Sequence, residues 1–209
     1  MDDTPTRDGR LTRIVLVRHG ETEWSRSGRH TSSTDLDLTE RGEDQARAVG
    51  AALEGQRFAR VVSSPRRRAT RTAHLAGFGE HLEIDDDLAE WDYGAYEGLT
   101  SPQIAERVGG RWNLWDDGVE AGATPGESCG DVYARARRVI ERMLPTLDSG
   151  GDVMIVAHGH YLRSFAAAWL GLPAERGRIF TLDTATISEL RFEHDEPVLA
   201  HWNSPPRDF

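Results

Sequence analysis

Two short apolar segments each lead into a histidine that a glycine follows. Residues 13–17 lead through Arg18 to His19, and residues 152–157 lead to His158. Apolar runs of this length, with helical patterns between them, are typical of parallel strands that helices cover on both faces. In such sheets, ligands bind at the carboxyl ends of the strands. We therefore expect His19 and His158 to share one pocket, although they are far apart in the sequence.

The rest of the chain alternates between strand and helix patterns. Thr39 and Ser64 are expected to cap helices, and Pro65 then takes the first helical position, which proline favours. The expected helices are residues 38–53, 64–76, 101–108, 127–147 and 161–170. The other expected strands are residues 60–63 and 82–84 and a hairpin of 186–192 with 198–201, while 88–99 are irregular. This order predicts an α/β fold of three layers, α/β/α, with a mostly parallel central sheet.

Length and composition narrow the classes of protein. The 209 residues suit one domain, which we place at residues 11–203 with flexible tails at 1–10 and 204–209. A net charge of −10 argues against general binding to nucleic acid or to acidic membranes. No apolar run approaches the roughly 18 residues that span a membrane, and residues 1–10 lack the apolar core of a signal peptide. Cys129 is the single cysteine, which excludes an internal disulfide, and we expect a cytoplasmic protein. The oligomeric state stays open, a homodimer included.

The residues at the strand ends have the chemistry of an anion site. A guanidinium such as that of Arg18 holds phosphate or carboxylate through several donors, and the neutral imidazole of His19 is a nucleophile at physiological pH. Gly20 permits a close approach of the backbone to a ligand. More arginines begin the helix expected at 64–76, where free backbone donors attract anions. We expect at least one of them to face the ligand and three to be solvated: Arg66, Arg67 and Arg71.

Several other residues have two interpretations. Glu90 lies among aromatic and acidic residues, where a carboxyl group can act as a general acid, whereas Asp92 and Glu97 are interpreted as ordinary loop acids. His160 follows closely on His158, but no second cluster of metal ligands accompanies the pair, so we interpret it as a capping or core residue. We expect no metal site. Three tryptophans suit a pocket wall and a core equally: Trp91, Trp112 and Trp115.

Four blocks of the sequence, in order and spacing, resemble the histidine phosphatase superfamily, which has the phosphoglycerate-mutase-like fold. The blocks are Arg18-His19-Gly20-Glu21-Thr22-Glu23-Trp24, Ser63-Ser64-Pro65-x-x-Arg68-Ala69-x-x-Thr72-Ala73, Leu88-x-Glu90-x-x-x-Gly94 and Ala157-His158-Gly159-x-x-x-Arg163. The resemblance implies that His19 attacks phosphorus and becomes phosphohistidine, and that Glu90 protonates the leaving oxygen and then activates water. It implies that three groups hold the phosphoryl oxygens: Arg18, Arg68 and His158. It implies a substrate-binding set as well: Ser25, Thr31, Ser32 and the backbone at Gly159.

The scheme that the resemblance implies uses neither a metal ion nor a cofactor. Its substrates are small phosphate esters. Within the superfamily, the sequence is most similar to the branch of actinobacterial acid phosphatases and sugar bisphosphatases. That similarity favours sugar phosphates or bisphosphates as the substrate class and does not identify one of them.

Two other functions are compatible with the motifs. A cofactor-dependent phosphoglycerate mutase resembles the same core but has a longer middle insertion with extra basic residues, whereas residues 109–128 contain one arginine, Arg111. We therefore favour hydrolysis. A non-catalytic module that binds phospho-ligands would usually have lost a catalytic group, and none of those groups is missing from this sequence. Residues 112–125 contain glycines and acids that suit a lid, and the sequence leaves open whether they form one.

Overall fold

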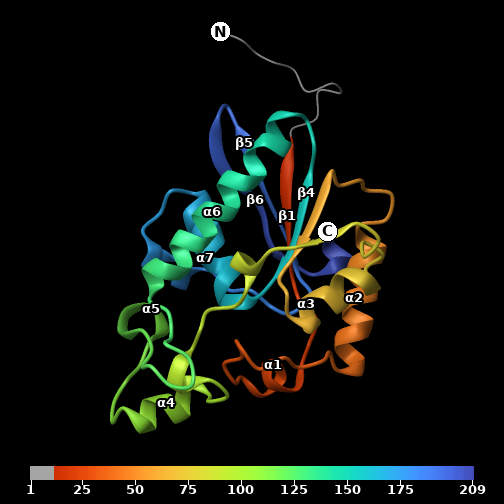
Figure 1. Ribbon diagram of the computed structural model, residues 1–209. Helices are drawn as coiled ribbons and strands as arrows, with labels where there is room; N and C mark the ends of the chain where they lie inside the picture. The colour runs from red at the N-terminus through yellow and green to blue at the C-terminus, as the bar shows by residue number, and fades with distance from the viewer. Residues whose placement is uncertain (1–11) are drawn as a thin grey trace.

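A six-stranded sheet forms the centre of the molecule (Figure 1). The computed structural model describes residues 12–209. Its strands are β1 (Arg13–Arg18), β2 (Arg60–Ser63), β3 (Leu82–Ile84), β4 (Val153–Ala157), β5 (Ile187–Glu193) and β6 (Glu196–Ser204). The order across the sheet is β3-β2-β4-β1-β5-β6, parallel from β3 to β1 and antiparallel where β5 pairs with β1 and with β6. The predicted mostly parallel sheet is confirmed, and the predicted hairpin extends it at one edge.

Helices cover both faces of the sheet, with α6 and α7 on one side and α2 and α3 on the other (Figure 1). The α-helices of the described region are α1 (Glu23–Ser27), α2 (Glu40–Ala52), α3 (Arg67–Leu75), α4 (Ser101–Arg107), α5 (Leu114–Asp117), α6 (Cys129–Asp148) and α7 (Gly159–Trp169). Short 3₁₀ helices lie at Asp86–Leu88, Gly94–Tyr96, Ala174–Ile179 and Pro206–Asp208. The predicted three-layer α/β/α arrangement is therefore confirmed.

Strand β1 shows why the sequence at this point is apolar throughout. Successive side chains of a strand point to opposite faces of the sheet. Ile14 and Leu16 belong to the core beneath α6 and α7, while Val15 and Val17 belong to the core beneath α2 and α3. All four side chains are almost completely buried. Because both faces are packed, β1 is a rigid support for the residues that follow its carboxyl end.

The helix that follows β2 begins later than the sequence predicts. α3 starts at Arg67 with Arg66 as the capping residue, so Pro65 precedes the helix. Ser64 does not cap α3 as predicted, because the helix starts at Arg67; its hydroxyl accepts from the Arg66 amide at 3.3 Å and is bonded to Nε2 of His158 at 2.7 Å. By contrast, Thr39 caps α2 as predicted, since its hydroxyl accepts from the Gly42 amide.

The carboxyl-terminal segment also differs from its prediction. The loose tail expected from residue 204 is not what the structure shows, because Ser204 still belongs to β6. Phe209 packs against the core beneath α2 and α3 and makes a ring contact with His201. The other expected tail, residues 1–10, lies outside the described residues.

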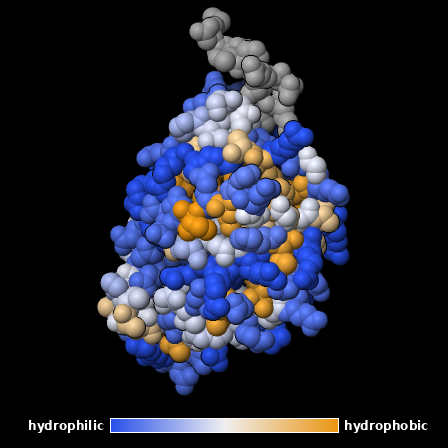
Figure 2. All heavy atoms as spheres, turned by 45° about the vertical axis from the view of Figure 1, so that its right-hand side comes forward, coloured by the Kyte–Doolittle hydropathy of each residue, from blue (hydrophilic) through white to orange (hydrophobic). Residues whose placement is uncertain are grey.

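The face of the molecule in Figure 2 is mostly hydrophilic, with hydrophobic side chains in small scattered groups. Within the described region, the large hydrophobic side chains that are exposed are Ile84, Val108 and Ile179. Each helix of residues 12–209 is too short or too polar to cross a lipid bilayer. The large apolar side chains of this region are therefore concentrated in the two cores on either side of the sheet.

Candidate active site

The carboxyl ends of β1, β2 and β4 bring the predicted residues together. Arg18 pairs with Ala157 in the sheet, so the residues that follow the two strands, His19 and His158, are neighbours. Their ring centroids are 5.2 Å apart. In Figure 1 this edge of the sheet faces α1, α4 and α5. The predicted meeting of the two histidines is confirmed, and it follows from the parallel pairing of β1 with β4.

His19 is held as a neutral imidazole with a defined free nitrogen. The residue is 5% exposed, and Nδ1 lies 2.7 Å from the carbonyl oxygen of Gly20. A carbonyl only accepts, so Nδ1 carries the proton and Nε2 keeps a lone pair. Burial lowers the pKa of His19 well below its ordinary value of 6.5, and the charges of Arg68 and Arg18 lower it further. The ring is therefore suited to nucleophilic attack through Nε2.

Gly20 has a different role from the predicted one. A Cβ at Gly20 would lie 2.3 Å from the carbonyl oxygen of Gly42. The space beside Gly20 is therefore occupied by the first turn of α2 rather than left for a ligand. This contact of two glycines brings α2 close to the end of β1 and fixes the turn that carries His19.

Arg18 offers free donors to the pocket. One terminal nitrogen donates to the Leu182 carbonyl, while the buried Nε has no partner among the described residues. A Cβ at Gly159 would lie 3.2 Å from Cζ of Arg18, so a glycine at this position leaves room for the guanidinium. Burial lowers the pKa of Arg18, and the nearby charge of Glu90 partly opposes this. An arginine keeps its proton in proteins, so Arg18 is a cation here.

Arg68 is buried behind the two histidines and organises the loop after α1. Its Nε donates to Nδ1 of His158 at 3.2 Å, so Nε2 of a neutral His158 carries the proton and donates to Ser64. Burial lowers the pKa of His158 well below 6.5, with further lowering by Arg68. The other Arg68 nitrogens donate to three carbonyls, those of Thr31, Ser32 and Thr34.

Arg18 and Arg68 share an electrostatic property. Within residues 12–209, neither has a carboxylate within ion-pair distance, although most of the other arginines there are paired (as Arg13 is with Asp152). Buried or partly buried charges are costly unless an opposite charge compensates them. Their placement beside His19 therefore indicates that an anion binds here.

Glu90 is fixed by backbone amides. Its carboxylate is buried and accepts hydrogen bonds from the amides of Trp91 and Tyr161 at Oε1 (2.9 and 2.8 Å) and from His160 at Oε2 (3.1 Å). Two of these donors belong to the first turn of α7, whose free amides point out of the helix end. The carboxyl group therefore has a defined orientation at the wall of the pocket.

The site opens into a cavity of about 390 Å³. Of the predicted residues, those that line it are Arg18, His19, Glu90, Ser25, Thr31 and Gly159. Three predicted residues lie behind this lining: Arg68, His158 and Ser32. The Ser32 hydroxyl is buried and donates to the Glu90 carbonyl at 3.4 Å, so its position differs from that of a ligand-binding side chain.

His160 is part of the pocket wall, so its interpretation as a capping or core residue is wrong. Its ring stacks on that of His30, with centroids 5.8 Å apart and an interplanar angle of 6°. Its Nδ1 is hydrogen-bonded to the Tyr93 hydroxyl at 2.6 Å. All three side chains line the cavity. The sequence placed His160 in the first turn after a strand end, and that position was the signal for a pocket residue.

Two of the three tryptophans line the cavity. Trp112 and Trp115 contribute to its wall, whereas Trp91 is completely buried and packs against Trp115. Within residues 12–209, no group of three or more His, Cys, Asp or Glu side chains is arranged to hold a metal ion.

The two acids interpreted as ordinary loop residues hold the backbone around the pocket. The Glu97 carboxylate accepts from the amides of Ser32 and Thr34. The Asp92 carboxylate accepts from the hydroxyl of Thr124 and from the amides of Gly94 and Gly126. The interpretation of both as ordinary loop acids is therefore corrected. Backbone amides in irregular segments lack the carbonyl partners of a helix or sheet, and these carboxylates accept from them instead.

An imidazole nucleophile beside unpaired positive charge suits phosphoryl transfer, and comparison with known proteins indicates a phosphatase. The sequence model of the histidine phosphatase superfamily (branch 1) matches residues 14–205, so the chain belongs to that superfamily and is a phosphatase. The predicted family is confirmed.

Individual relatives agree with this assignment. An acid phosphatase of Mycobacterium tuberculosis is 43% identical over 190 residues, which cover 90% of each chain. Sedoheptulose 1,7-bisphosphatase of Saccharomyces cerevisiae is 38% identical over 189 residues, which cover 78% of this chain and 69% of the yeast protein. A solved structure of an open reading frame product of Mycobacterium tuberculosis superposes with a TM-score of 0.86 at 41% identity and covers 94% of this chain and all of the other.

Proposed function

We propose that this phosphatase hydrolyses small phosphate monoesters without a metal ion, through a phosphohistidine at His19 and with Glu90 as general acid and base. The observation that carries the proposal is the neutral His19 ring, whose free Nε2 lies beside two arginines that lack carboxylate partners. A phosphoryl group supplies the missing negative charge, and its transfer depends mainly on positioning and electrostatic stabilisation.

The reaction has two balanced steps. In the first, the Nε2 lone pair of His19 forms a bond to phosphorus as the P–O ester bond breaks, and the departing oxygen takes a proton from the Glu90 carboxyl group. In the second, the Glu90 carboxylate takes a proton from a water molecule whose oxygen attacks phosphorus. The N–P bond breaks, its electron pair returns to Nε2, and inorganic phosphate leaves.

The charged groups take different parts in this scheme. Arg18, which lines the cavity, binds the phosphoryl oxygens directly through its free donors. Arg68 contributes positive charge from behind the lining and holds His158 in place. The resemblance assigns His158 to the phosphoryl oxygens as well; its Nε2 proton, which donates to Ser64 here, would then donate to a phosphoryl oxygen instead.

The cavity supports sugar phosphates or sugar bisphosphates as substrates. Its volume lies within the usual range for small-molecule sites, roughly 300–1,000 Å³. Its wall combines hydroxyls, imidazoles and aromatic rings, which suit a polyhydroxylated carbon chain, and Arg29, which also lines it, suits a second anionic group. The name of the yeast relative, a sugar bisphosphatase, agrees with this class. Arg111, the one arginine of the middle segment, does not line the cavity, which favours hydrolysis over mutase activity.

The test is phosphate release from sugar phosphates, sugar bisphosphates and phosphoglycerates, measured without added metal for the wild type and His19→Ala. We expect release by the wild type and none above background by the variant, and the ranking of substrates names the preferred class. Interconversion of 2- and 3-phosphoglycerate without phosphate release would replace this proposal with the mutase function. Binding of phosphate esters with neither reaction would indicate a binding module.

A further inference from the structure

The segment that carries Glu90 has no regular secondary structure to hold it. Residues 89–93 lie between two 3₁₀ helices, Asp86–Leu88 and Gly94–Tyr96. Backbone carbonyls in such a segment need donors from elsewhere in the protein. The general acid of the proposed reaction therefore depends on groups outside its own segment for its position.

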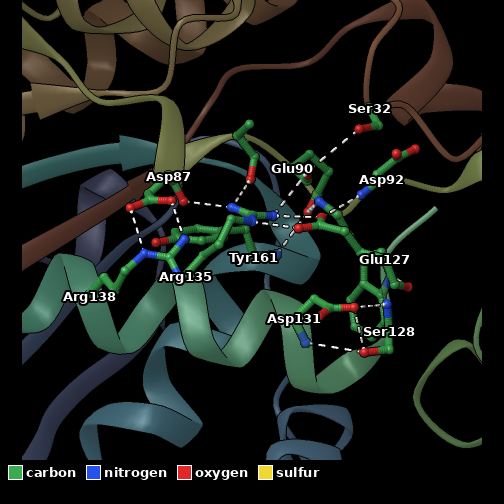
Figure 3. Close-up of polar contacts among 12 residues, drawn as sticks. Ser32, Asp87, Glu90, Asp92, Glu127, Ser128, Asp131, Arg135, Arg138 and Tyr161 are labelled. Atoms are coloured by element: carbon green, nitrogen blue, oxygen red, sulfur yellow. Dashed lines mark hydrogen bonds and ion pairs between the residues drawn. The ribbon is translucent and has the colours of Figure 1, made fainter. Parts of the chain in front are cut away.

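Arg135 supplies these donors from α6. One terminal nitrogen donates to the carbonyls of Asp87 at 2.6 Å and Ala89 at 3.0 Å, and the other approaches the Glu90 carbonyl at 3.5 Å. Figure 3 shows the guanidinium reaching from the helix toward this backbone. The side chain is 12% exposed, and it lies over the ring of Tyr161. Arg135 thus holds the chain on the side that precedes Glu90.

Glu127 holds the chain on the side that follows Glu90. Its carboxylate forms a two-point ion pair with Arg135, at 2.7 and 2.8 Å, and also accepts from the Asp92 amide at 2.9 Å (Figure 3). Its carbonyl accepts from the indole nitrogen of Trp91 at 2.8 Å. One ion pair therefore fixes the backbone both before and after Glu90.

We infer that Arg135 and Glu127 are positioning residues that set the place of the Glu90 carboxyl group for proton transfer. Neither side chain lines the cavity, so both act through Glu90. The inference rests on the proposed role of Glu90 in the reaction. Misplacement of a catalytic group by about 1 Å is enough to slow a reaction strongly, which gives a clamp of this kind a direct effect on rate.

The test compares esters that differ in the need for proton donation. An alkyl phosphate needs a proton on its leaving oxygen, whereas 4-nitrophenolate leaves well without one. We expect Arg135→Met to lower kcat/KM for an alkyl phosphate about tenfold or more, part of the roughly 100- to 10,000-fold that a general acid contributes. For 4-nitrophenyl phosphate we expect a loss of about threefold or less. The ratio kcat/KM reports the steps up to the transfer of the phosphoryl group to His19. Hydrolysis of the phosphohistidine, which is the same for both esters, therefore does not affect the comparison.

Arg138→Met is the matched control. Arg138 lies one helical turn further along α6, its side chain is half exposed, and it pairs with the Asp87 carboxylate, which also keeps Arg142 as a partner. It donates to the Asp87 carboxylate, whereas the carbonyls of Ala89 and Glu90 accept from Arg135. We expect both esters to react with this variant at the wild-type rate. A loss of the same size for both esters in Arg135→Met, or equal behaviour of the two arginine variants, would overturn the inference.

Glu127→Gln keeps the inference testable if Arg135→Met fails to fold. It retains the shape of the side chain but removes the ion pair, and we expect the same selective loss for the alkyl ester. A double variant that combines Glu127→Gln with Glu90→Gln separates action through Glu90 from general damage to the protein. If Glu127 acts through Glu90, the double variant should discriminate between the two esters no more than Glu90→Gln alone does. If Glu90→Gln itself shows no selectivity, the proposed role of Glu90 fails. If it is selective and Glu127→Gln is not, only the positioning role fails.

Discussion

Nε of Arg68 donates a hydrogen bond to Nδ1 of His158 at 3.2 Å, and this contact joins the two halves of the site. Arg68 comes from α3, which follows β2, and His158 immediately follows β4. The same guanidinium holds the carbonyls of the loop at residues 31–34. A single buried cation therefore orients the second histidine, shapes one wall of the pocket and adds to the lowering of the pKa of His19 by burial.

Arg68→Lys should lower kcat/KM by about 100-fold, the size of the effect when groups of the site are misplaced by about 1 Å. A lysine ammonium is a compact charge and cannot reach His158 and three carbonyls together. Steady-state kinetics with 4-nitrophenyl phosphate measures the effect. The matched control is Arg71→Lys on the same helix, whose exposed side chain pairs with Glu43. A loss of similar size in both variants would remove the special role of Arg68.

Gly159→Ala should weaken the binding of phosphate about tenfold while the protein stays folded, as the loss of a charge-assisted hydrogen bond predicts. The new methyl group would press on the Arg18 guanidinium, which lies 3.2 Å from its position. Competitive inhibition by inorganic phosphate measures the effect. Gly130→Ala in the first turn of α6 is the control, because its Cβ would lie 3.7 Å from the nearest atom, an ordinary contact. Unchanged inhibition in Gly159→Ala contradicts the role assigned to Arg18.

The rate should persist at pH values where an ordinary histidine is protonated. The nucleophile must be neutral, and the pKa of His19 lies well below 6.5 because of burial and of the charges of Arg68 and Arg18. The acidic limb of kcat/KM should therefore fall at a pH clearly below 6.5. A pH–rate profile with 4-nitrophenyl phosphate checks this. A limb at 6.5 or above would show that the imidazole of His19 is not held neutral.

The free energy of unfolding should decrease as the pH is lowered below about 6.5. The unfolded chain protonates its histidines near their ordinary value of 6.5, whereas the folded chain does not protonate His19 and His158 until a much lower pH. Between these values the unfolded state binds more protons, so acid favours unfolding. Urea unfolding at several pH values should show a shallower dependence for His158→Gln than for the wild type. Equal slopes would contradict the lowered pKa of His158.

Chelators should leave the rate unchanged. In the proposed reaction, the negative charge of the phosphoryl oxygens is compensated by the positive charges of Arg18 and Arg68. Phosphate release should therefore be equal before and after treatment with EDTA and dialysis. Loss of activity that returns when a divalent metal is added would contradict the metal-independent mechanism.

Much of the fold and the centre of the site could be predicted because they depend on local patterns. Buried strands read as apolar runs, and parallel pairing brings their carboxyl ends together whatever the length of chain between them. That reasoning placed His19 beside His158, and the family resemblance assigned Arg68 to the same site. It did not predict the bond between the Ser64 hydroxyl and His158, because that contact depends on tertiary structure and not on the local sequence.

The remaining differences come from irregular segments. Asp92 and Glu97 bond to amides that are distant in the sequence, and no periodic pattern predicts such contacts. For the same reason, His160 lines the cavity although a capping or core residue is expected, and Ser32 lies behind the lining although a substrate-binding residue is expected. The path of a loop decides which side chain reaches the cavity. The contacts of Phe209 with the core also depend on how the last strand ends. The sequence of this short polar segment contains no sign of these contacts and therefore predicts a loose tail.

The measurement that tests the account most directly is the trapping of the phosphorylated enzyme. The wild type is mixed with 4-nitrophenyl phosphate and quenched in base, where phosphohistidine survives, and its peptides are analysed by mass spectrometry. We predict one phosphoryl group on the peptide that contains His19, located on that residue, and none in His19→Ala. A phosphoryl group on another residue, or rapid turnover of the ester by His19→Ala, would contradict the assignment of His19 as the nucleophile.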